Sequence, residues 1–423
     1  MKFLFVTDEA LSADLAWQVK KEGHEVRFYC RGQGEKDVGD GFFDKVAEWE
    51  PHKDWADVIL LDDVGFGSKA EQLRGEGKHV VGGSTYTDKL ELDREFGQAE
   101  LKQSGVAVLP SWNFSSFDEA VAFVKANPNR YVIKPSGKAQ DEKELLFIGQ
   151  EPDGKDVLQV LEHYKANWSK KIKEFQVQLY AEGVEIAVGA FFNGKEFVRP
   201  INVNFEHKRL FPSELGPSTG EMGTHLYWTK NNPVFESTLL KMKEKLAASG
   251  YVGYIDINCI ANNKGIWPLE WTSRFGYPTI SIQMEGITSE WGQFLSDLAQ
   301  GKDAQLRAKK GYQVGVVVAI PPWPFQDDKA FKKYSEGASI LFRKQNLDGV
   351  HIEEVKLEQG DWHIAGNSGY ALVVTGSGAT MSDAIREAYQ NVKNVMIPNM
   401  FYRTDIGQRW THESDKLLSW GYL

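Results

Sequence analysis

The first hundred residues alternate short apolar runs with amphipathic stretches. The runs KFLFVT, HEVRFYC, DVILLDD and HVVGG, which begin at residues 2, 24, 57 and 79, are typical of short buried strands. Between the first two runs, Leu11, Leu15 and Val19 recur at helical spacing, and Gly23 follows them. Because strands and helices alternate, the pattern predicts an α/β domain with a doubly wound parallel sheet over residues 1–105.

The next segment mixes helical and strand patterns and then changes to long strands. Its pattern predicts a helix at residues 88–105, a strand at 106–112, a helix at 116–128 and a strand at 130–137. From Glu174 to Arg209 the residues are strand-like and nearly continuous, with a turn at FNGK. We therefore expect a small unit over residues 106–185 and an antiparallel sheet after it.

The last two units are predicted in the same way. Residues 235–250 have the pattern of one helix, and the strands YVGYIDINCI and IWPLEWTS follow as a hairpin around the turn NNKG. From Tyr312 onward, strands at residues 312–320, 349–357 and 370–378 precede a helix at 381–395. The expected units are a central one over residues 186–310 and a C-terminal mixed-sheet domain over 311–423.

Composition narrows the class of protein. The chain has 423 residues, which is too long for one core, and a net charge of -10, which argues against a general affinity for nucleic acid or for an anionic membrane. Cys30 and Cys259 are the only cysteines, so the sequence indicates neither a disulfide framework nor a cysteine metal site. The start does not resemble a signal peptide, and no run approaches about 18 apolar residues. We expect a cytoplasmic protein.

The loop after the first predicted strand bears on dinucleotide binding. It reads TDEALSAD and lacks the glycines that let backbone amides approach a pyrophosphate. The sequence therefore does not favour NAD or FAD as a cofactor.

Two acids stand on neighbouring strands of the predicted hairpin. Asp256 lies among apolar residues of the first strand, and Glu270 lies in the second. Two ionised carboxylates in a poorly solvated setting repel each other unless a cation lies between them, and Mg²⁺ prefers such oxygen ligands. The alternative, which these two residues leave open, is that either acid pairs with Arg274 or Lys208.

Cations and a glycine loop occur elsewhere in the chain. Lys134 ends a predicted strand, where it would reach a phosphate or, as is commoner for a lone lysine, remain solvated. His207, Lys208 and Arg209 precede the loop GPSTGEMGT, whose backbone amides suit an anion. Together with the acidic hairpin, these features supply the charge neutralisation and metal bridging that phosphoryl transfer needs.

Several motifs carry a family resemblance over nearly the whole chain. In order they are VIKPSG, YAEGVEIAV, HKRLFPSELGPSTGEMGT, PLEWTSRFGYP, GYALVVTGSGATMSDAIREAY and MFYRTDIGQR. This order resembles the phosphoribosylamine–glycine ligases of the ATP-grasp superfamily. The resemblance implies an ATP-grasp fold with a pre-ATP-grasp domain at residues 1–105, a small ATP-grasp subdomain at 106–185, a central catalytic subdomain at 186–310 and a C-terminal domain at 311–423.

The resemblance also implies roles for individual residues. It gives Mg²⁺ or Mn²⁺ to Glu270, Asp256 and Thr272, and it makes Arg274 and Lys208 the catalytic cations, with Arg274 on the phosphorylated carboxylate. Lys134 would contact the ATP phosphates, the segment from Gln178 to Ala181 the adenine, and Glu185 the ribose. The full set expected to bind ATP is Arg94, Lys134, Lys143, Gln178, Leu179, Tyr180, Ala181 and Glu185.

The chain departs from the family at several positions. The acidic loop TDEALSAD stands where the family has a glycine-rich loop for a phosphate, the phosphate loop GKAQDEKELLF keeps only Gly137, and Thr272 and Thr279 replace an amide and an acid. We therefore predict an ATP-dependent carboxylate–amine ligase whose amine is not phosphoribosylamine. Its expected partners are a small carboxylate (glycine or another amino acid) and an amine, with no nucleic acid or membrane, in a monomer or homodimer.

Two alternatives remain open at this point. One is a true phosphoribosylamine–glycine ligase of purine synthesis. The other is a catalytically weakened nucleotide-binding protein, since the thinned phosphate loop and Thr272 would both reduce turnover.

Overall fold

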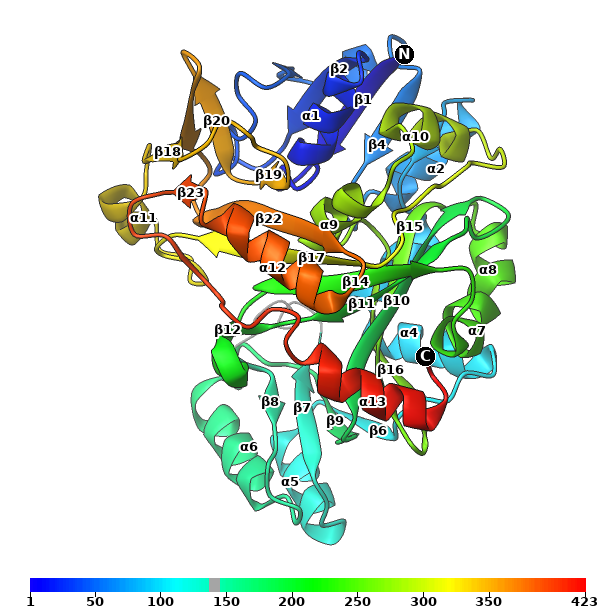
Figure 1. Ribbon diagram of the computed structural model, residues 1–423. Coiled ribbons are helices and arrows are strands. Elements are labelled where there is room, and N and C mark those ends of the chain that lie inside the picture. Colours follow the sequence, from blue (N-terminus) through cyan, green and yellow to red (C-terminus); the bar gives the residue numbers. More distant parts are fainter. Residues whose placement is uncertain (137–144) are drawn as a thin grey trace.

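The computed structural model describes residues 1–136 and 145–423, which form five sheets (Figure 1). The N-terminal sheet has the order β3-β2-β1-β4-β5, and all of its pairings are parallel. Its strands are β1 (Lys2–Thr7), β2 (Glu25–Cys30), β3 (Asp44–Lys45), β4 (Val58–Leu61) and β5 (Val80–Val81). The predicted parallel sheet is confirmed.

Both faces of this sheet are covered because alternate residues of β1 point in opposite directions. Phe3 and Phe5 pack with Leu15 of α1 (Ala13–Lys21) in one buried cluster. Leu4 and Val6 pack with residues of α2 (Gly67–Gly75) in another. The sheet is thus doubly wound, as the sequence predicted.

The helix predicted at residues 88–105 is interrupted. It forms as α3 (Thr85–Leu92) and α4 (Arg94–Gln103). Asp93 between them has an extended backbone, and its side chain accepts a hydrogen bond from the backbone N–H of Phe96. An aspartate at this position caps a new helix, and the amphipathic pattern alone did not reveal the break.

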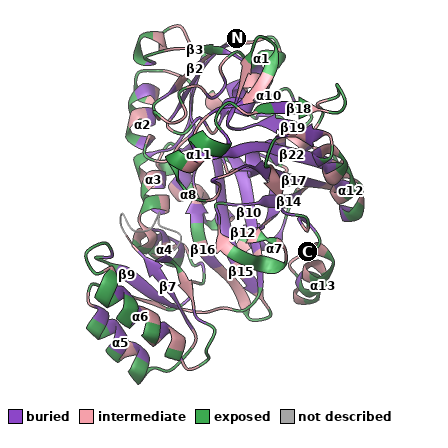
Figure 2. Cartoon of the chain, turned by 90° about the vertical axis from the view of Figure 1, so that its left-hand side faces the viewer, coloured by how far each residue is buried: buried purple, intermediate pink, exposed green. Residues whose placement is uncertain are grey.

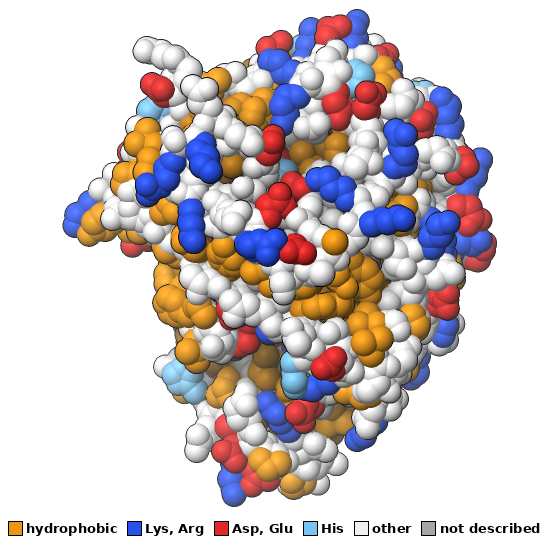
Figure 3. All heavy atoms as spheres, viewed as in Figure 1, with side chains coloured by type: hydrophobic (Ala, Val, Ile, Leu, Met, Phe, Trp, Pro, Cys, Tyr) orange, Lys and Arg blue, Asp and Glu red, His pale blue; other side chains and the backbone are white. Residues whose placement is uncertain are grey.

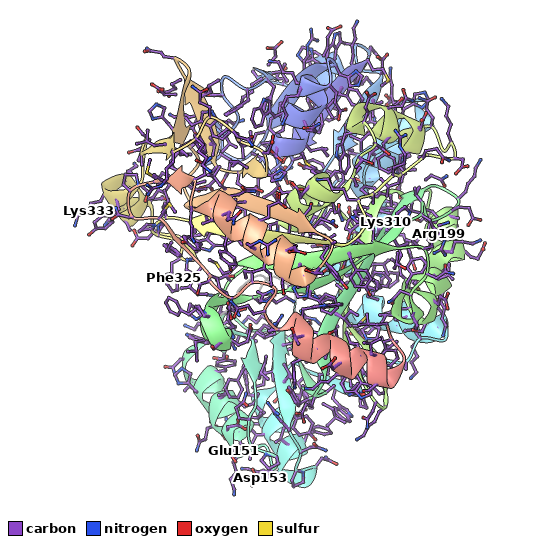
Figure 4. All side chains as sticks on the ribbon, in the orientation of Figure 1. Glu151, Asp153, Arg199, Lys310, Phe325 and Lys333 are labelled. Atoms are coloured by element: carbon purple, nitrogen blue, oxygen red, sulfur yellow. The ribbon has the colours of Figure 1, made fainter. Side chains whose placement is uncertain are left out.

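The small subdomain is an antiparallel sheet with two helices on one face. The sheet has the order β6-β9-β7-β8, with strands β6 (Ser111–Phe114), β7 (Tyr131–Pro135), β8 (Phe147–Ile148) and β9 (Phe175–Leu179). The helices α5 (Phe117–Ala126) and α6 (Lys155–Asn167) share its buried cluster. Figure 4 shows Glu151 and Asp153 at the end of this unit that is remote from the central sheet.

The central sheet lies between the N-terminal sheet and the small subdomain (Figure 1). Its order is β16-β15-β10-β11-β14-β17-β22-β19, and β24 also pairs with β17. Figure 2 shows its central strands buried, while the outer sides of α5 and α6 are exposed. The strands are β10 (Val184–Asn193), β11 (Ile201–Glu206), β14 (Gly223–Thr229), β15 (Val252–Asn262), β16 (Gly265–Thr272), β17 (Tyr312–Ala319), β19 (Val350–Ile352), β22 (Tyr370–Gly378) and β24 (Phe401–Tyr402).

The helices around the central sheet differ from the prediction at one place. Residues 235–250, expected as one helix, belong to three short segments, because Thr238 leaves the helical conformation with φ -124° and ψ -89°. These segments are α7 (Pro233–Ser237), the 3₁₀ turn Leu239–Met242 and α8 (Lys243–Ala248). The other helices are α9 (Thr279–Gly286), α10 (Trp291–Ala299), α12 (Met381–Val392) and α13 (Trp410–Trp420).

The C-terminal strands continue the central sheet. β14 pairs with β17 across the boundary predicted at residues 310 and 311, which stays a prediction as a domain limit. The mixed sheet expected here is corrected in one respect, because within the described residues the C-terminal strands pair antiparallel. A second C-terminal sheet contains β18 (Ser339–Phe342), β20 (Val355–Glu358), β21 (Asp361–Ile364) and β23 (Val395–Met396), beside α11 (Asp328–Tyr334).

A tight turn shows why these strands run antiparallel. β20 and β21 are joined by Gln359 and Gly360, whose φ angles are 54° and 94°. Two residues with positive φ form the hairpin turn that matches the twist of paired strands. Another hairpin, β12 (Arg209–Phe211) with β13 (Leu215–Ser218), projects beside the central sheet.

The surface has no single-sign face on the side viewed in Figure 3, where basic and acidic side chains are interspersed. Within residues 1–136 and 145–423, no helix is long and apolar enough to cross a membrane.

Candidate active site

One lysine gathers three carboxylates at the edge of the central sheet. The Nζ atom of Lys208 lies 2.8 Å from Glu185 on β10, 3.0 Å from Glu206 on β11 and 3.0 Å from Glu270 on β16. The alternative in which Glu270 pairs with Lys208 is therefore realised in the structure. Because one ammonium faces three acids, the cluster keeps surplus negative charge, which a further cation would stabilise.

The ion pairs shift the titration of this cluster. Attraction to Lys208 is the largest cause that lowers the pKa of Glu270 to about 2. Burial raises the pKa of Glu206, and Lys208 opposes this shift. Glu270 therefore stays ionised at neutral pH, and its side chain is 53% exposed. An ionised, accessible carboxylate can ligate a metal without first losing a proton.

The hairpin register differs from the simple pairing of the two acids. Asn258 lies opposite Glu270, and Asp256 lies opposite Thr272. The register shifts by one residue after Asn258, because Cys259 pairs with Pro268 and Leu269 is left over. A bulge of this kind is common where a proline, which has no N–H to donate, enters a strand.

Asp256 is buried and held by neutral donors. Its Oδ2 accepts hydrogen bonds from Asn204, at 2.8 Å, and from the Tyr254 hydroxyl, at 3.0 Å. Burial, and secondly the charge of Glu206, raises the pKa of Asp256 to about 7. Gly189 on β10 pairs with Asp256, and a Cβ there would approach the Tyr254 hydroxyl to 1.9 Å and Asp256 Oδ2 to 2.7 Å. The glycine therefore makes room for the Tyr254–Asp256 hydrogen bond.

The donor set fits magnesium that is shared with a phosphate ligand. Among the described residues, no group of three or more His, Cys, Asp or Glu side chains could hold a metal alone. The Oδ1 atom of Asn258 is buried without a partner and lies beside Glu270 in the register. Mg²⁺ usually takes one or two protein carboxylates and completes its shell with water and phosphate oxygens, and Glu270, Asn258 and Asp256 match that demand.

Two further cations come from other units. Lys134 on β7 is 8% exposed, and Arg94 at the start of α4 donates to the carbonyl of Pro135 at 2.9 Å. Burial, aided by the charge of Arg94, lowers the pKa of Lys134 to about 7, while Glu270 opposes the shift. Burial also lowers the pKa of Arg94. When an anion binds beside Lys134 and Arg94, a partly deprotonated Lys134 would regain its proton.

The predicted adenine segment links β9 to β10 and thus joins the two ATP-grasp units. The N–H of Leu179 donates to the carbonyl of Pro110, and that of Tyr180 donates to the carbonyl of Arg130, both at 3.0 Å. The Tyr180 ring also lies 3.4 Å from the Arg130 guanidinium carbon. Gln178 is buried, and its Nε2 has no partner, so this side chain keeps a donor available.

Arg274 lies on the other side of the hairpin, near the N-terminal sheet. Its Nη2 is 3.2 Å from Glu91, and its Nη1 donates to the carbonyl of Phe275 at 2.9 Å. Glu91 in turn accepts from the N–H of Ser273 at 2.7 Å. These contacts fix the guanidinium in one orientation and place it between α3 and β16.

The structure thus brings most of the predicted residues together. Lys134, Glu185, Lys208 and Glu270 share one charge cluster, and Asp256 and Thr272 lie beside it on the hairpin. Lys143 lies outside the described residues. The roles assigned to all these residues, including the ATP contacts, stay predictions.

Sequence reasoning missed Glu206, Asn204, Asn258 and Glu91. The first two alternate on β11 with buried Ile201, Val203 and Phe205, and this period of two was visible in the run INVNFE. Asn258 stands two residues after Asp256 and shares its face for the same reason. Glu91 carried no local signal, because its partner Arg274 is distant in sequence.

A small antiparallel sheet and a large central sheet that meet at a lysine–carboxylate cluster define an ATP-grasp enzyme. Two family models match the chain: "Phosphoribosylglycinamide synthetase, ATP-grasp (A) domain" over residues 92–280 and "Phosphoribosylglycinamide synthetase, C domain" over residues 313–409. The chain therefore belongs to the ATP-grasp family, as a member of phosphoribosylglycinamide synthetase type.

Individual proteins agree with this assignment. The phosphoribosylamine–glycine ligase of Streptococcus pneumoniae is 24% identical over 356 residues, which cover 82% of each chain. The crystal structure of the Thermotoga maritima phosphoribosylamine–glycine ligase matches with a TM-score of 0.72 at 21% identity and covers 96% of this chain and 100% of that one.

A more distant structure shares the fold. The biotin carboxylase domain of the Hydrogenobacter thermophilus 2-oxoglutarate carboxylase, which was solved with MgADP, matches with a TM-score of 0.66 at 12% identity over 95% of this chain and 91% of that one. The predicted fold class is confirmed. So is the predicted class of enzyme, an ADP-forming carboxylate–amine ligase.

Proposed function

We propose that this chain uses ATP and magnesium to activate a small carboxylate as an acyl phosphate and then joins it to an amine. The cluster in which Lys208 meets Glu185, Glu206 and Glu270 supports this most directly. A purely structural ion pair needs one carboxylate for a lysine. Three acids around one ammonium, with Lys134 and Arg94 close by, suit the charges of a metal–nucleotide instead.

Each residue has one task in this scheme. Lys134 and Arg94 hold phosphate oxygens, while Gln178 and the following segment face the adenine and Glu185 the ribose. Glu270 would hold Mg²⁺ together with Asn258 and Asp256, and Thr272 lies beside them. When bound there, Mg²⁺ would supply positive charge for the transferred phosphoryl group.

The chemistry then runs in two balanced steps. A carboxylate oxygen, oriented by Arg274, attacks the γ-phosphorus, and the bond to the β-phosphate oxygen breaks to release ADP. The amine nitrogen next attacks the acyl carbon, the phosphate leaves with its bonding electrons, and the nitrogen loses one proton. Lys208 stabilises the negative charge that develops in the first step.

The amine has two candidates. Phosphoribosylamine is favoured because the similar proteins are phosphoribosylamine–glycine ligases. These similarities give no support for a different amine. A different amine is favoured by the acids that follow β1 and β4, which are described below. Glycine is the first carboxylate to test under either candidate.

Hydroxylamine separates activation of the carboxylate from the choice of amine, because it captures any acyl phosphate as a hydroxamate. The purified chain is incubated with ATP, MgCl₂, hydroxylamine and, in turn, glycine and each of the other common amino acids. We expect ADP and one hydroxamate in equal amounts. ATP binding without hydroxamate or ADP from any carboxylate would contradict the proposal and favour the weakened nucleotide-binding protein.

A further inference from the structure

A second group of acids lies where β1 and β4 end. Asp8 and Glu9 follow β1, and Asp62 and Asp63 follow β4. The N–H of Asp8 donates to Asp63 at 2.8 Å, and the N–H of Ser12 donates to Asp62 at 3.1 Å. These bonds lock the two turns together at the carboxyl edge of the parallel sheet, which is where open α/β sheets bind their ligands.

Buried polar atoms without partners face this group. Asp62 is 2% exposed, and its Oδ1 accepts no hydrogen bond. The hydroxyl of Tyr277 is buried without a partner, and after burial the charges of Asp62 and Asp63 contribute most to raising the pKa of Tyr277. Tyr277 stands two residues before α9, in the same loop as Arg274. A buried donor and a buried acceptor that are both unused indicate a site for a polar ligand.

The polar lining continues into the C-terminal region. Glu353 is 5% exposed and accepts from Ser281 of α9 at 3.3 Å. Tyr370 is 9% exposed, and its hydroxyl has no hydrogen-bond partner. Burial, and secondly the charges of Glu353 and Glu221, raise the pKa of Tyr370. The charge of Glu353 also raises the pKa of Tyr277. The two hydroxyls without partners are thus both under the influence of the Glu353 carboxylate.

The charges in this group are mostly negative. Asp63, Glu35 and Asp8 all raise the pKa of Glu9, although less than burial does, and Arg274 lowers it. Arg274 is already engaged with Glu91, and Arg31 pairs with Asp8. A phosphate monoester placed here would meet several carboxylates, whereas an ammonium group would be attracted to them.

We propose that this acidic cluster, formed by Glu9, Asp62, Asp63, Tyr277 and Glu353, binds the acceptor amine as a small cation without a phosphate group. The acceptor carries a positive charge besides its reacting nitrogen, as a diamine does, and the two tyrosine hydroxyls bind its other polar groups. This inference rests on the proposed ligase function and names the substrate class of the same active site.

Two probes distinguish the acceptor classes. Isothermal titration of the full chain uses 1,4-diaminobutane as the cationic probe and ribose 5-phosphate as the phosphorylated one, each in the presence of MgATP. We expect the diamine to bind more tightly than ribose 5-phosphate. The variants Glu9→Gln and Asp63→Asn should each weaken diamine binding about 10-fold, on the scale of one charge-assisted hydrogen bond.

Matched controls keep the result specific. Asp63→Asn retains an oxygen acceptor for the N–H of Asp8, so the turns stay joined, and its thermal unfolding midpoint confirms folding. Glu25→Gln removes an exposed acid at the opposite end of the same sheet and should leave both affinities unchanged.

Three results would overturn the inference: tighter binding of ribose 5-phosphate, no binding of the diamine, or equal weakening by Glu25→Gln. Failure of the ligase function is recognised separately, because the hydroxamate assay on the unaltered chain needs no acceptor amine. Hydroxamate formation together with tight ribose 5-phosphate binding would return the chain to the phosphoribosylamine candidate.

Discussion

Two charged regions of this chain differ in how their carboxylates are paired with cations. In the cluster around Lys208, cations and carboxylates from β10, β11 and β16 already meet, with distances of 2.8 to 3.0 Å. In the acidic cluster beside β1 and β4, the charge of Arg274 lowers the pKa of Glu9, but Arg274 is itself paired with Glu91, and Arg31 is paired with Asp8. In the first region Lys208 already pairs with three acids, whereas in the second Arg274 pairs with Glu91 instead.

The difference teaches how each region meets its ligand. A cluster whose ions are already paired can exchange partners: in the proposed mechanism Lys208 would turn from Glu270 to a phosphate, and a metal would take its place on the carboxylate. An acidic cluster instead selects the sign of its ligand's charge. The predictions that follow perturb one region at a time.

The largest effect is expected from Glu270→Gln in the cluster. The amide keeps the size of the side chain but loses the charge that holds magnesium, so ADP release should fall roughly 100-fold or more, since even outer-shell changes at metal sites lower activity by about 10- to 100-fold. The rate is measured over a range of MgCl₂ concentrations. Glu196→Gln, which removes the surface partner of Lys243, is the control and should be silent. Full activity of Glu270→Gln would remove the metal assignment.

Arg274→Lys tests the arginine beside the acidic cluster. Lysine keeps the charge but lacks the planar fork that binds a carboxylate and Glu91 together. We expect turnover to fall by roughly 30-fold, the loss of about one charge-assisted bond, with unchanged ATP affinity. Arg199→Lys is the control, because Arg199 lies at the outer edge of the molecule (Figure 4). A matching loss of ATP affinity would move Arg274 from the carboxylate to the nucleotide.

Lys134 makes ATP binding depend on pH. Its pKa of about 7 means that the ammonium form dominates below this pH and the neutral amine above it. ATP phosphates favour the ammonium, so binding at pH 8 should take up close to one proton, and affinity should fall about fivefold between pH 7 and 8. Titration calorimetry in buffers of different ionisation enthalpy measures the uptake. Lys134→Arg stays protonated, and its binding should lose this dependence; if it persists, another group titrates.

The smallest effect is expected on the free energy of unfolding, from Asp62 in the acidic cluster. Burial and the charge of Asp63 raise the pKa of Asp62 above its ordinary 3.8, so its ionised form destabilises the folded state at neutral pH. Asp62→Asn should therefore raise the free energy of unfolding by about 1 kcal/mol at pH 7.5. The gain should shrink as the pH falls toward 4, where the wild-type acid is protonated. Urea unfolding measures it, with exposed Asp44→Asn as the control, and destabilisation at pH 7.5 would contradict the assignment.

Much of the fold followed from periodicity in the sequence. Four strands of the parallel sheet and the β15–β16 hairpin were predicted because their apolar runs are short and bounded by turn residues, whereas the two-residue strand β3 was not predicted. The helices at 88–105 and 235–250 were predicted to be too long. The amphipathic spacing continues through Asp93 and Thr238, whereas the backbone leaves the helical conformation at both residues. Helix caps are set by single side-chain hydrogen bonds, which a hydrophobic pattern does not register.

The site was predicted as a set of charges rather than as a geometry. Lys134 and Glu270 were found because each is a charge beside apolar residues, and Lys208 because it stands in a run of cations before a glycine loop. The register that brings Asn258 rather than Asp256 opposite Glu270 depends on one extra residue near Pro268, and a shift of one residue changes every partner in a hairpin. Pairings between distant segments, such as Arg274 with Glu91, needed the folded chain.

The pairing of β14 with β17 has a consequence for expression of parts of this protein. A fragment that ended near residue 310 would leave one side of β14 without hydrogen-bond partners, in the middle of a buried apolar sheet. Open strand edges of this kind recruit other chains. The ATP-grasp core and the C-terminal strands are therefore expected to fold and evolve as one unit, and a shortened chain should aggregate rather than retain partial activity.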